Sequence, residues 1–178
     1  MTDMRRLVLL RHFKSDRSAS GVADHDRPLN TRGHEQGPLI AAYLVHNALV
    51  PDRVLCSTAA RARATWDLVT RHLPKPPLVA LEERLYEAEP ETILDLVRET
   101  SQKAHSLLVV GHNPGLQQAA LMLIASGDVE MRERLREKFP TGALAVIDFA
   151  LDEWRKVHPH AGRLDRLVTP RMLSEEPD

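Results

Sequence analysis

The sequence predicts an α/β fold, a three-layer α/β/α sandwich around a mainly parallel sheet. Two observations lead to this prediction. Short apolar runs alternate along the chain with segments of helical periodicity, and polar residues follow directly after several of the apolar runs. The 178 residues match the usual size of one domain, so we expect residues 1–178 to form a single domain. Residues from about 171 to 178 are expected to form a flexible tail.

The first strand, loop and helix are predicted within the first 46 residues. Leu7–Leu10 is a short apolar run that ends at a charged residue, which indicates a buried strand. The polar segment 13–29 has no periodicity and is long for a simple connection, so it indicates a functional loop. The next helix is expected to begin at Asn30 or Thr31, because either side chain can cap it.

The middle of the chain repeats the alternation of strand and helix. Arg53–Ser57 predicts the second strand. The Ala- and Arg-rich segment 59–72 follows helical spacing, and Pro74 helps to end it. Leu78–Leu81 predicts a short third strand, and Pro90 occupies the first position of the next predicted helix.

The last third of the chain adds the strongest strand signal. Ser106–Val110 is this strand, and Leu116–Ala125 continues the chain as a helix. Residues 129–138 predict a highly charged helix. Gly142–Phe149 predicts a strand that runs antiparallel to its neighbours, since a helix precedes it and a hairpin is expected after it. Trp154–Val157 is the expected edge strand of that hairpin.

Composition excludes several classes of protein. Lys and Arg number 24 and Asp and Glu 25, whereas a nucleic-acid-binding protein is normally basic, so nucleic acid is not an expected partner. The one cysteine, Cys56, excludes an internal disulfide and suits a reducing compartment, which predicts a cytoplasmic protein. The apolar run near the first residue is far shorter than the roughly 20 residues of a membrane span, so no membrane association is expected.

Polar side chains follow four of the predicted strands. They are Arg11 and His12, then Ser57 and Arg61, then Tyr86 and Glu87, and finally His112 and Asn113. Because the carboxyl ends of parallel strands meet at one edge of a sheet, and ligands bind beyond that edge, we expect these side chains to form one site.

The residue types at this edge suit a phosphoryl group. Two guanidiniums bind phosphoryl oxygens through paired hydrogen bonds, and a helix that begins at Pro114 adds its positive end. A histidine among these groups can attack phosphorus and become a phosphohistidine. The set includes no cluster of carboxylates, so neither a metal ion nor another cofactor is expected.

Each residue alone also has a simpler explanation. Arg11 and Arg61 could be solvated charges, and His112 could cap a helix or lie in the core. The combination is more specific than its parts, because separate strand ends would have to carry matching chemistry by accident.

Six segments of the chain together resemble one known family. They are Leu9–Ser15 (LLRHFKS), Asp26–Gly33 (DRPLNTRG), Leu55–Thr65 (LCSTAARARAT), Leu85–Ala88 (LYEA), Val109–Gly115 (VVGHNPG) and Phe139–Val146 (FPTGALAV). In order and spacing they resemble the histidine phosphatase superfamily, also called phosphoglycerate-mutase-like, and within it the SixA-type phosphohistidine phosphatases. The resemblance extends from residue 7 to about residue 170.

The resemblance implies a role for several residues. His12 would be the nucleophile that becomes phosphorylated, in a phosphate pocket completed by Arg11, Arg61 and His112. Glu87 falls where many members keep a proton donor for the leaving group, and the alternative is a surface carboxylate before the helix that begins at Pro90.

Other positions qualify this assignment. Lys14 and Ser15 are candidates for contact with phosphate, although a loop lysine is usually solvated. Asp26 and Arg27 could orient the pocket through an ion pair or form an ordinary surface pair. Phe13 stands where the superfamily usually has Gly and the SixA-type branch often Ala, so it is expected to narrow the mouth of the site or to turn outward. Cys56 is expected to be buried in its strand.

The function that the sequence favours is a metal-independent phosphatase. It would hydrolyse phosphohistidine on a partner protein through a covalent phosphohistidine intermediate, because a short chain has little room for the cap segments that enclose small substrates in the mutase branches. A phosphatase of small phosphate monoesters is the first alternative. A non-catalytic module that binds a phosphorylated ligand is an alternative of another class.

Overall fold

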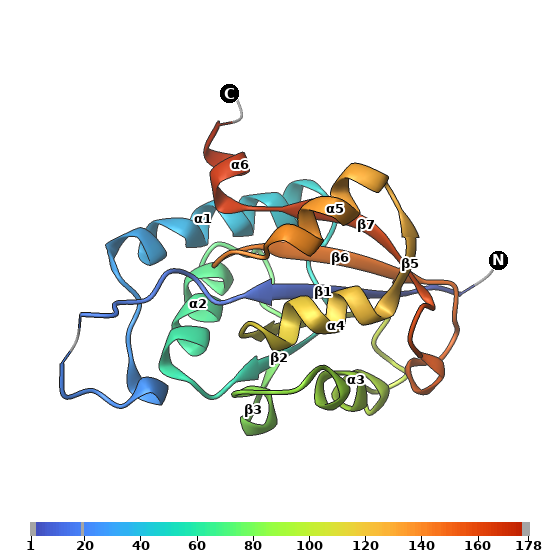
Figure 1. The fold of residues 1–178 in the computed structure, drawn as a ribbon, viewed down its shortest axis with the longest axis horizontal. Coiled ribbons are helices and arrows are strands. Elements are labelled where there is room, and N and C mark those ends of the chain that lie inside the picture. Colours follow the sequence, from blue (N-terminus) through green and yellow to red (C-terminus); the bar gives the residue numbers. More distant parts are fainter. Residues whose placement is uncertain (1–2, 19, 176–178) are drawn as a thin grey trace.

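The computed structural model describes residues 3–18 and 20–175 (Figure 1). Within these residues, seven strands form one sheet in the order β3-β2-β4-β1-β6-β7-β5. Four neighbouring pairs of strands are parallel, and the two pairs that involve β6 are antiparallel. The predicted α/β sandwich with a mainly parallel sheet is therefore confirmed.

The parallel part of the sheet brings four strand ends to one edge. It consists of β1 (Arg5–Arg11), β2 (Arg53–Ser57), β3 (Leu78–Glu82) and β4 (Ser106–Gly111). Arg11 is opposite Gly111 in the register of β1 and β4, and Cys56 is opposite Val110 in that of β2 and β4. The residues that follow β1, β2 and β4 consequently emerge side by side.

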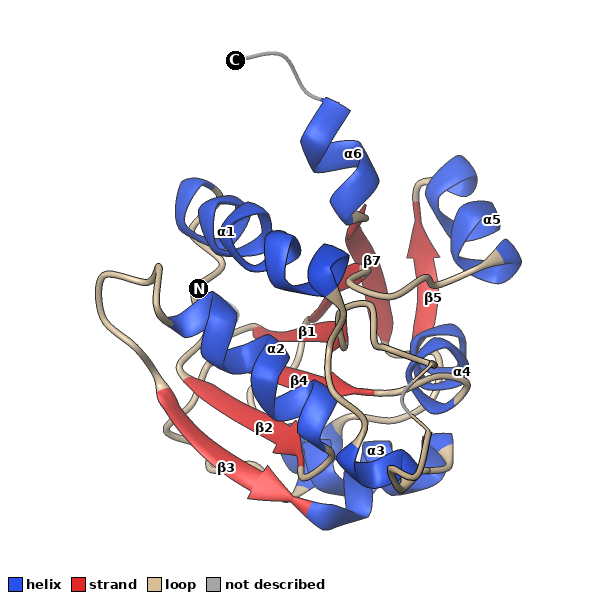
Figure 2. Ribbon diagram, turned by 90° about the vertical axis from the view of Figure 1, so that its left-hand side faces the viewer, coloured by secondary structure: helices blue, strands red, loops and turns tan. Residues whose placement is uncertain are grey.

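Helices cover both faces of the sheet (Figure 2). One face carries α1 (Thr31–His46), α2 (Ala60–Thr70) and α6 (Pro170–Glu175). The other carries α3 (Pro90–Arg98), α4 (Gly115–Leu123) and α5 (Val129–Glu137). Side chains of β1 alternate between the two cores, with Leu7 and Leu9 on the α4 side and Val8 and Leu10 on the α1 side. This explains why β1 is a continuous apolar run.

Helix α1 holds the end of the polar loop close to the sheet. The Asn30 side chain accepts a hydrogen bond from the backbone N–H of Gly33 at 2.9 Å, so Asn30 is the capping residue. The backbone N–H of Asn30 donates in turn to the Lys14 carbonyl at 3.0 Å. A Cβ atom at Gly33 would lie 2.3 Å from that carbonyl oxygen, so only glycine permits this approach.

Phe13 and Cys56 are both fully buried on the α1 side of the sheet. Phe13 packs in the same core as Leu29 and Ile40, so neither expectation for this residue is correct: it does not narrow the mouth and does not turn outward. Burial raises the pKa of the Cys56 thiol to about 12, as expected for a small core residue.

The end of the chain differs from the sequence prediction. Trp154–Lys156 forms a 3₁₀ helix rather than a strand, and the buried Trp154 ring donates to the Ala104 carbonyl at 2.7 Å. The strand that forms a hairpin with β6 (Leu144–Phe149) is β7 (Gly162–Val168), which lies later in the chain than predicted. A short β5 (Ile124–Gly127) replaces the last residues of the helix predicted over 116–125 and pairs with β7.

The prediction of a flexible tail from about residue 171 is also partly wrong. Residues 171–175 belong to α6, whose Leu173 packs against the core beneath α1. Residues 176–178 lie outside the described part of the chain. No described helix is both long enough and apolar enough to cross a membrane.

Candidate active site

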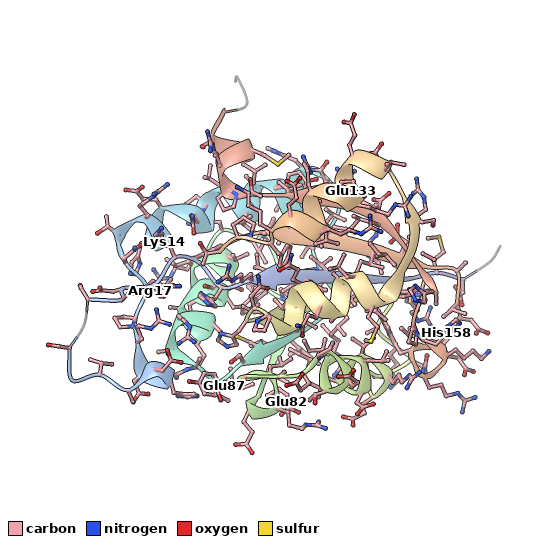
Figure 3. The ribbon with its side chains drawn as sticks, viewed as in Figure 1. Lys14, Arg17, Glu82, Glu87, Glu133 and His158 are labelled. Carbon is pink, nitrogen blue, oxygen red and sulfur yellow. The ribbon has the colours of Figure 1, made fainter. Side chains whose placement is uncertain are left out.

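A cavity of about 730 Å³ opens at the edge of the sheet where β1 and β4 end. It is lined by six of the seven residues proposed as catalytic or phosphate-contacting: Arg11, His12, Lys14, Ser15, Arg61 and His112, but not Glu87. Figure 3 shows Lys14 and Arg17 at this end of the molecule, whereas His158 lies at the opposite end.

His12 follows β1 directly and is 5% exposed. Its Nδ1 lies 2.7 Å from the Phe13 carbonyl oxygen, which can only accept, so Nδ1 carries a proton. In the neutral ring, Nε2 therefore holds a lone pair, and Arg61 Nε donates to it at 3.3 Å. Burial, reinforced by the nearby His112 and Arg61, lowers the pKa of His12 to about 3. The ring is consequently neutral near pH 7.

Arg61 lies in the first turn of α2, and Thr65 ties this turn to the chain after β1. The backbone N–H of Phe13 donates to Thr65 Oγ1 at 2.8 Å, and the Thr65 hydroxyl donates to the Arg61 carbonyl at 2.7 Å. Residues four apart share one face of a helix, so Arg61 and Thr65 both face the chain around His12. Thr65 is fully buried, so this link between α2 and β1 is shielded from water.

His112 follows β4, and its ring packs against the rings of His12 and Tyr86, with centroid distances of 5.1 and 5.6 Å. Ser57 Oγ, at the end of β2, lies 2.7 Å from His112 Nε2 in a hydrogen bond. Burial, together with the charge of Arg61, lowers the pKa of His112 to about 4. The second histidine is thus also neutral near pH 7.

Arg11 is held by the segment that precedes β6. Arg11 Nη1 donates to the Phe139 carbonyl at 3.0 Å, and Asn113 Nδ2 donates to the same oxygen at 2.8 Å. Burial, and then the charges of Arg17 and Arg61, lower the pKa of Arg11. A guanidinium remains protonated near pH 7 despite such a shift, so Arg11 keeps its positive charge.

Two polar atoms of this site have no hydrogen-bond partner among the described residues. They are Arg11 Nε and His112 Nδ1, both buried. A buried polar atom without a partner costs about 1–3 kcal/mol. The Arg11 Nε–H, and His112 Nδ1 when it carries the proton of the ring, could each donate to an oxygen atom of a bound anion.

Asp24, in the loop between β1 and α1, is a site residue that sequence reasoning missed. Its carboxylate accepts from the Tyr86 hydroxyl at 2.5 Å, from Arg61 Nη2 at 3.1 Å and from Arg27 Nη2 at 3.1 Å. Its carbonyl accepts from Arg61 Nη1 at 2.7 Å. The Tyr86 hydrogen bond, followed by the charge of Arg61, lowers the pKa of Asp24 to about 2. The sequence offered one signal for this contact: Tyr86, the hydrogen-bond partner of Asp24, belongs to the LYEA segment.

The two loop residues after Phe13 differ in exposure. Ser15 is buried, and its Oγ accepts from Arg27 Nη1 at 2.5 Å, whereas Lys14 is exposed. Arg27 pairs with Asp24 and not with Asp26, so the ion pair expected between Asp26 and Arg27 is absent among the described contacts.

The structure does not bring Glu87 into the cavity of His12. Glu87 is exposed, and its φ of 55° lies in the left-handed region. It lines a second cavity of about 300 Å³, which shares Arg61, His112 and Asn113 with the first.

The arrangement can bind a tetrahedral oxyanion beside a neutral imidazole. Arg11 and Arg61 supply charged donors, and the Nε2 lone pair of the His12 ring lies beside Arg61. Among residues 3–18 and 20–175, no group of three or more His, Cys, Asp or Glu residues is placed to hold a metal ion.

Comparison with known proteins shows the family to which the chain is related. A sequence profile of the histidine phosphatase superfamily (branch 1) matches residues 7–93. An uncharacterized protein of Mycobacterium tuberculosis is 40% identical over 164 residues, which cover 91% of this chain and 100% of the relative.

Two solved structures extend the comparison to the whole fold. The candidate phosphohistidine phosphatase SixA of Agrobacterium tumefaciens is 31% identical, with a TM-score of 0.78 over 93% of this chain and 98% of that one. Its counterpart from Nakamurella multipartitia is 28% identical, with a TM-score of 0.80 over 94% and 96%. The chain is a phosphoric hydrolase and belongs to the histidine phosphatase superfamily. Within that superfamily it is of the SixA type.

Proposed function

We propose that this phosphatase removes the phosphoryl group from phosphohistidine on a partner protein, without a metal ion and through a covalent intermediate on His12. The observation that carries the proposal is the state of the His12 ring. Its Nδ1 donates to the Phe13 carbonyl, so the lone pair of Nε2 faces Arg61 in the cavity.

The nucleophile needs no base to activate it. A histidine with a pKa of about 3 is neutral near pH 7, so Nε2 can attack phosphorus once the Arg61 Nε–H transfers its hydrogen bond from Nε2 to a phosphoryl oxygen. When the phosphoryl group is attached, the ring still carries its Nδ1 proton and becomes cationic. The Phe13 carbonyl, which accepts that proton's hydrogen bond, stabilises the positive ring.

Arg11, Arg61 and His112 are proposed to hold the phosphoryl oxygens. Charge on these oxygens is balanced by guanidiniums that are already oriented, which is the main way enzymes accelerate phosphoryl transfer. The unpartnered Arg11 Nε supports this role, because a phosphoryl oxygen would supply its missing acceptor.

The reaction has two balanced steps. First, a bond forms between His12 Nε2 and phosphorus while the bond from phosphorus to the substrate imidazole breaks, and that imidazole keeps the electron pair and takes a proton from solvent. Second, water attacks phosphorus, the bond to Nε2 breaks with its electron pair returning to His12, and inorganic phosphate leaves with the water oxygen while one proton of that water passes to solvent.

The position of Glu87 supports phosphohistidine as the substrate. Imidazole is a better leaving group than an alkoxide, so cleavage of a P–N bond depends less on a proton donor. Glu87 is exposed and does not line the cavity that contains His12. The proposed partner is a phosphohistidine-bearing protein in the cytoplasm, a compartment that suits the single buried Cys56.

A phosphatase of small phosphate monoesters is the second candidate. It is favoured by one observation, the cavity of about 300 Å³ that contains Glu87 and shares Arg61 and His112 with the first. If an ester were bound across both cavities, Glu87 would be available to protonate the alkoxide.

A paired hydrolysis assay separates the two candidates. One arm uses a histidine-phosphorylated protein, and the other uses a panel of phosphate monoesters, each with wild type, His12→Ala and Glu87→Gln. The proposal predicts a strong preference for the phosphoprotein, with Glu87→Gln close to wild type. A preference for esters that is lost in Glu87→Gln contradicts it and supports the second candidate.

A further inference from the structure

A third cavity, of about 340 Å³, lies beside the cavity of His12 and shares Lys14 and Thr141 with it. It is bounded by the start of α1, the end of α5 and α6. Its other charged lining residues are Arg32, Glu35, Lys138 and Arg171.

These two adjoining cavities differ in charge from the rest of the molecule. Their lining includes eight Lys or Arg residues and only two acidic ones, Asp16 and Glu35. The whole chain has 24 basic and 25 acidic residues. Positive charge is therefore concentrated around the site, and the remainder of the chain is acidic.

Five of these cations are exposed, and we name four of them the basic rim: Lys14, Arg17, Arg32 and Lys138. The fifth, Arg171, interacts with another group of the chain. None of the four forms an ion pair with another residue in the described part of the chain. Arg27 and Arg61, deeper in the site, are by contrast paired with Asp24. Figure 3 shows Lys14 and Arg17 on the loop beyond β1, at the entrance end of the molecule.

The basic rim extends farther than one phosphoryl group requires. Arg32 and Lys138 line only the third cavity and do not line the cavity of His12. A phosphoryl group on His12 would be bound by Arg11 and Arg61. The more distant cations are therefore available to other groups of the same substrate.

We propose that the basic rim binds acidic side chains that flank the phosphohistidine on the partner protein. This inference rests on the proposed function and specifies its substrate class. Complementary charge around a site speeds association and selects partners, and exposed pairs act mainly through encounter and salt-sensitive binding. A protein segment is favoured over nucleic acid because the chain as a whole has a net charge of −1, whereas nucleic-acid-binding domains are strongly basic.

The test compares three substrates: a phosphohistidine peptide flanked by acidic residues, the same peptide with those residues changed to Asn and Gln, and free phosphohistidine. The variant is the double substitution Arg32→Glu with Lys138→Glu, which leaves the residues of the His12 cavity intact. Lys103→Glu is the matched control, because Lys103 is exposed and lies before β4, at the opposite edge of the sheet.

Wild type is expected to prefer the acidic peptide over the neutral one by about ten-fold in kcat/KM, mainly through KM, because each exposed pair contributes a factor of about two to five. The double variant should lose this preference, and salt above about 0.5 M should abolish it in wild type. Hydrolysis of free phosphohistidine should stay within about two-fold of wild type in both variants, because neither touches the His12 cavity.

Equal kcat/KM for the two peptides in wild type would overturn the role of the basic rim while leaving the proposed function intact. A single-stranded oligonucleotide that displaces the acidic peptide at a lower concentration than the peptide's own KM would also overturn it, in favour of nucleic acid. If wild type hydrolyses none of the three substrates, the proposed function itself is wrong, and the inference is lost with it.

Discussion

Arg61 Nε donates to His12 Nε2 at 3.3 Å, while the other two nitrogens of the same guanidinium bind Asp24. One arginine thus joins the proposed nucleophile to a carboxylate from the loop between β1 and α1. An anionic substrate that binds Arg61 must share this guanidinium with the Asp24 carboxylate. Asp24 therefore competes with a bound phosphoryl group for the positive charge of Arg61.

Replacing Asp24 with Asn is expected to strengthen the binding of inorganic phosphate by about five-fold, because the pair of the buried Arg61 with the exposed Asp24 carboxylate is expected to contribute about 1 kcal/mol. Inhibition by inorganic phosphate measures the effect. Asp26→Asn is the control, because Asp26 lies beside His25 and does not contact Arg61. Weaker phosphate binding in Asp24→Asn would mean that the carboxylate holds Arg61 in its working position.

Removal of divalent metal ions is expected to leave activity unchanged. The proposed mechanism neutralises the phosphoryl charge with guanidiniums, so no step depends on a metal. Hydrolysis is measured after dialysis against EDTA and again after addition of Mg²⁺, Mn²⁺ or Zn²⁺. A loss of activity that one of these ions restores would show that the site has been misinterpreted.

The two buried histidines are expected to make the protein less stable in mild acid. Their pKa values are about 3 for His12 and about 4 for His112, below the value of about 6.5 in an unfolded chain. Between pH 4 and about pH 6.5 the unfolded chain binds more protons than the folded protein does. The free energy of unfolding therefore falls as the pH falls through this range. At pH 5 the loss is on the order of 2 kcal/mol for each histidine.

Chemical denaturation at pH 5 and pH 7.5 measures this effect. His112→Asn removes one of the two titrating histidines. The difference in unfolding free energy between the two pH values should therefore fall by about half, whether or not the variant is less stable than wild type at either pH. A variant with the full wild-type pH dependence would exclude His112 as a source of it.

Phe13→Ala is expected to lower the free energy of unfolding by about 3–5 kcal/mol, because it opens a space in a closed core. Phe13→Leu should recover much of the loss. Denaturant titration of both variants provides the measurement. If Phe13→Ala is as stable as wild type, the ring does not pack in the core as described.

Arg11, His12 and His112 could be located from the sequence because each lies within two residues of the end of a strong apolar run. The position of a residue relative to a strand end is a local property, and parallel strands carry such positions to a common edge. Arg61 was found through its motif and its place in the first turn of α2.

Asp24, unlike Tyr86 after the third strand, could not be located in this way. The two are 62 residues apart, and their contact depends on how a loop without periodicity folds back over the sheet. The same limit applies to β7, whose charged residues Arg163, Asp165 and Arg166 hide its strand pattern. Trp154 and Val157 suggested a strand by their apolar character, but a 3₁₀ turn buries both.

The central claim is that His12 carries the phosphoryl group during turnover, and trapping that species tests it most directly. The protein is mixed with a radiolabelled phosphohistidine substrate, quenched in alkali within milliseconds and digested, and the label is located by mass spectrometry. We predict a label at His12 that is stable in alkali and lost in acid, and no labelled protein or hydrolysis with His12→Ala. Rapid hydrolysis by His12→Ala, or a label on another residue, would contradict the account.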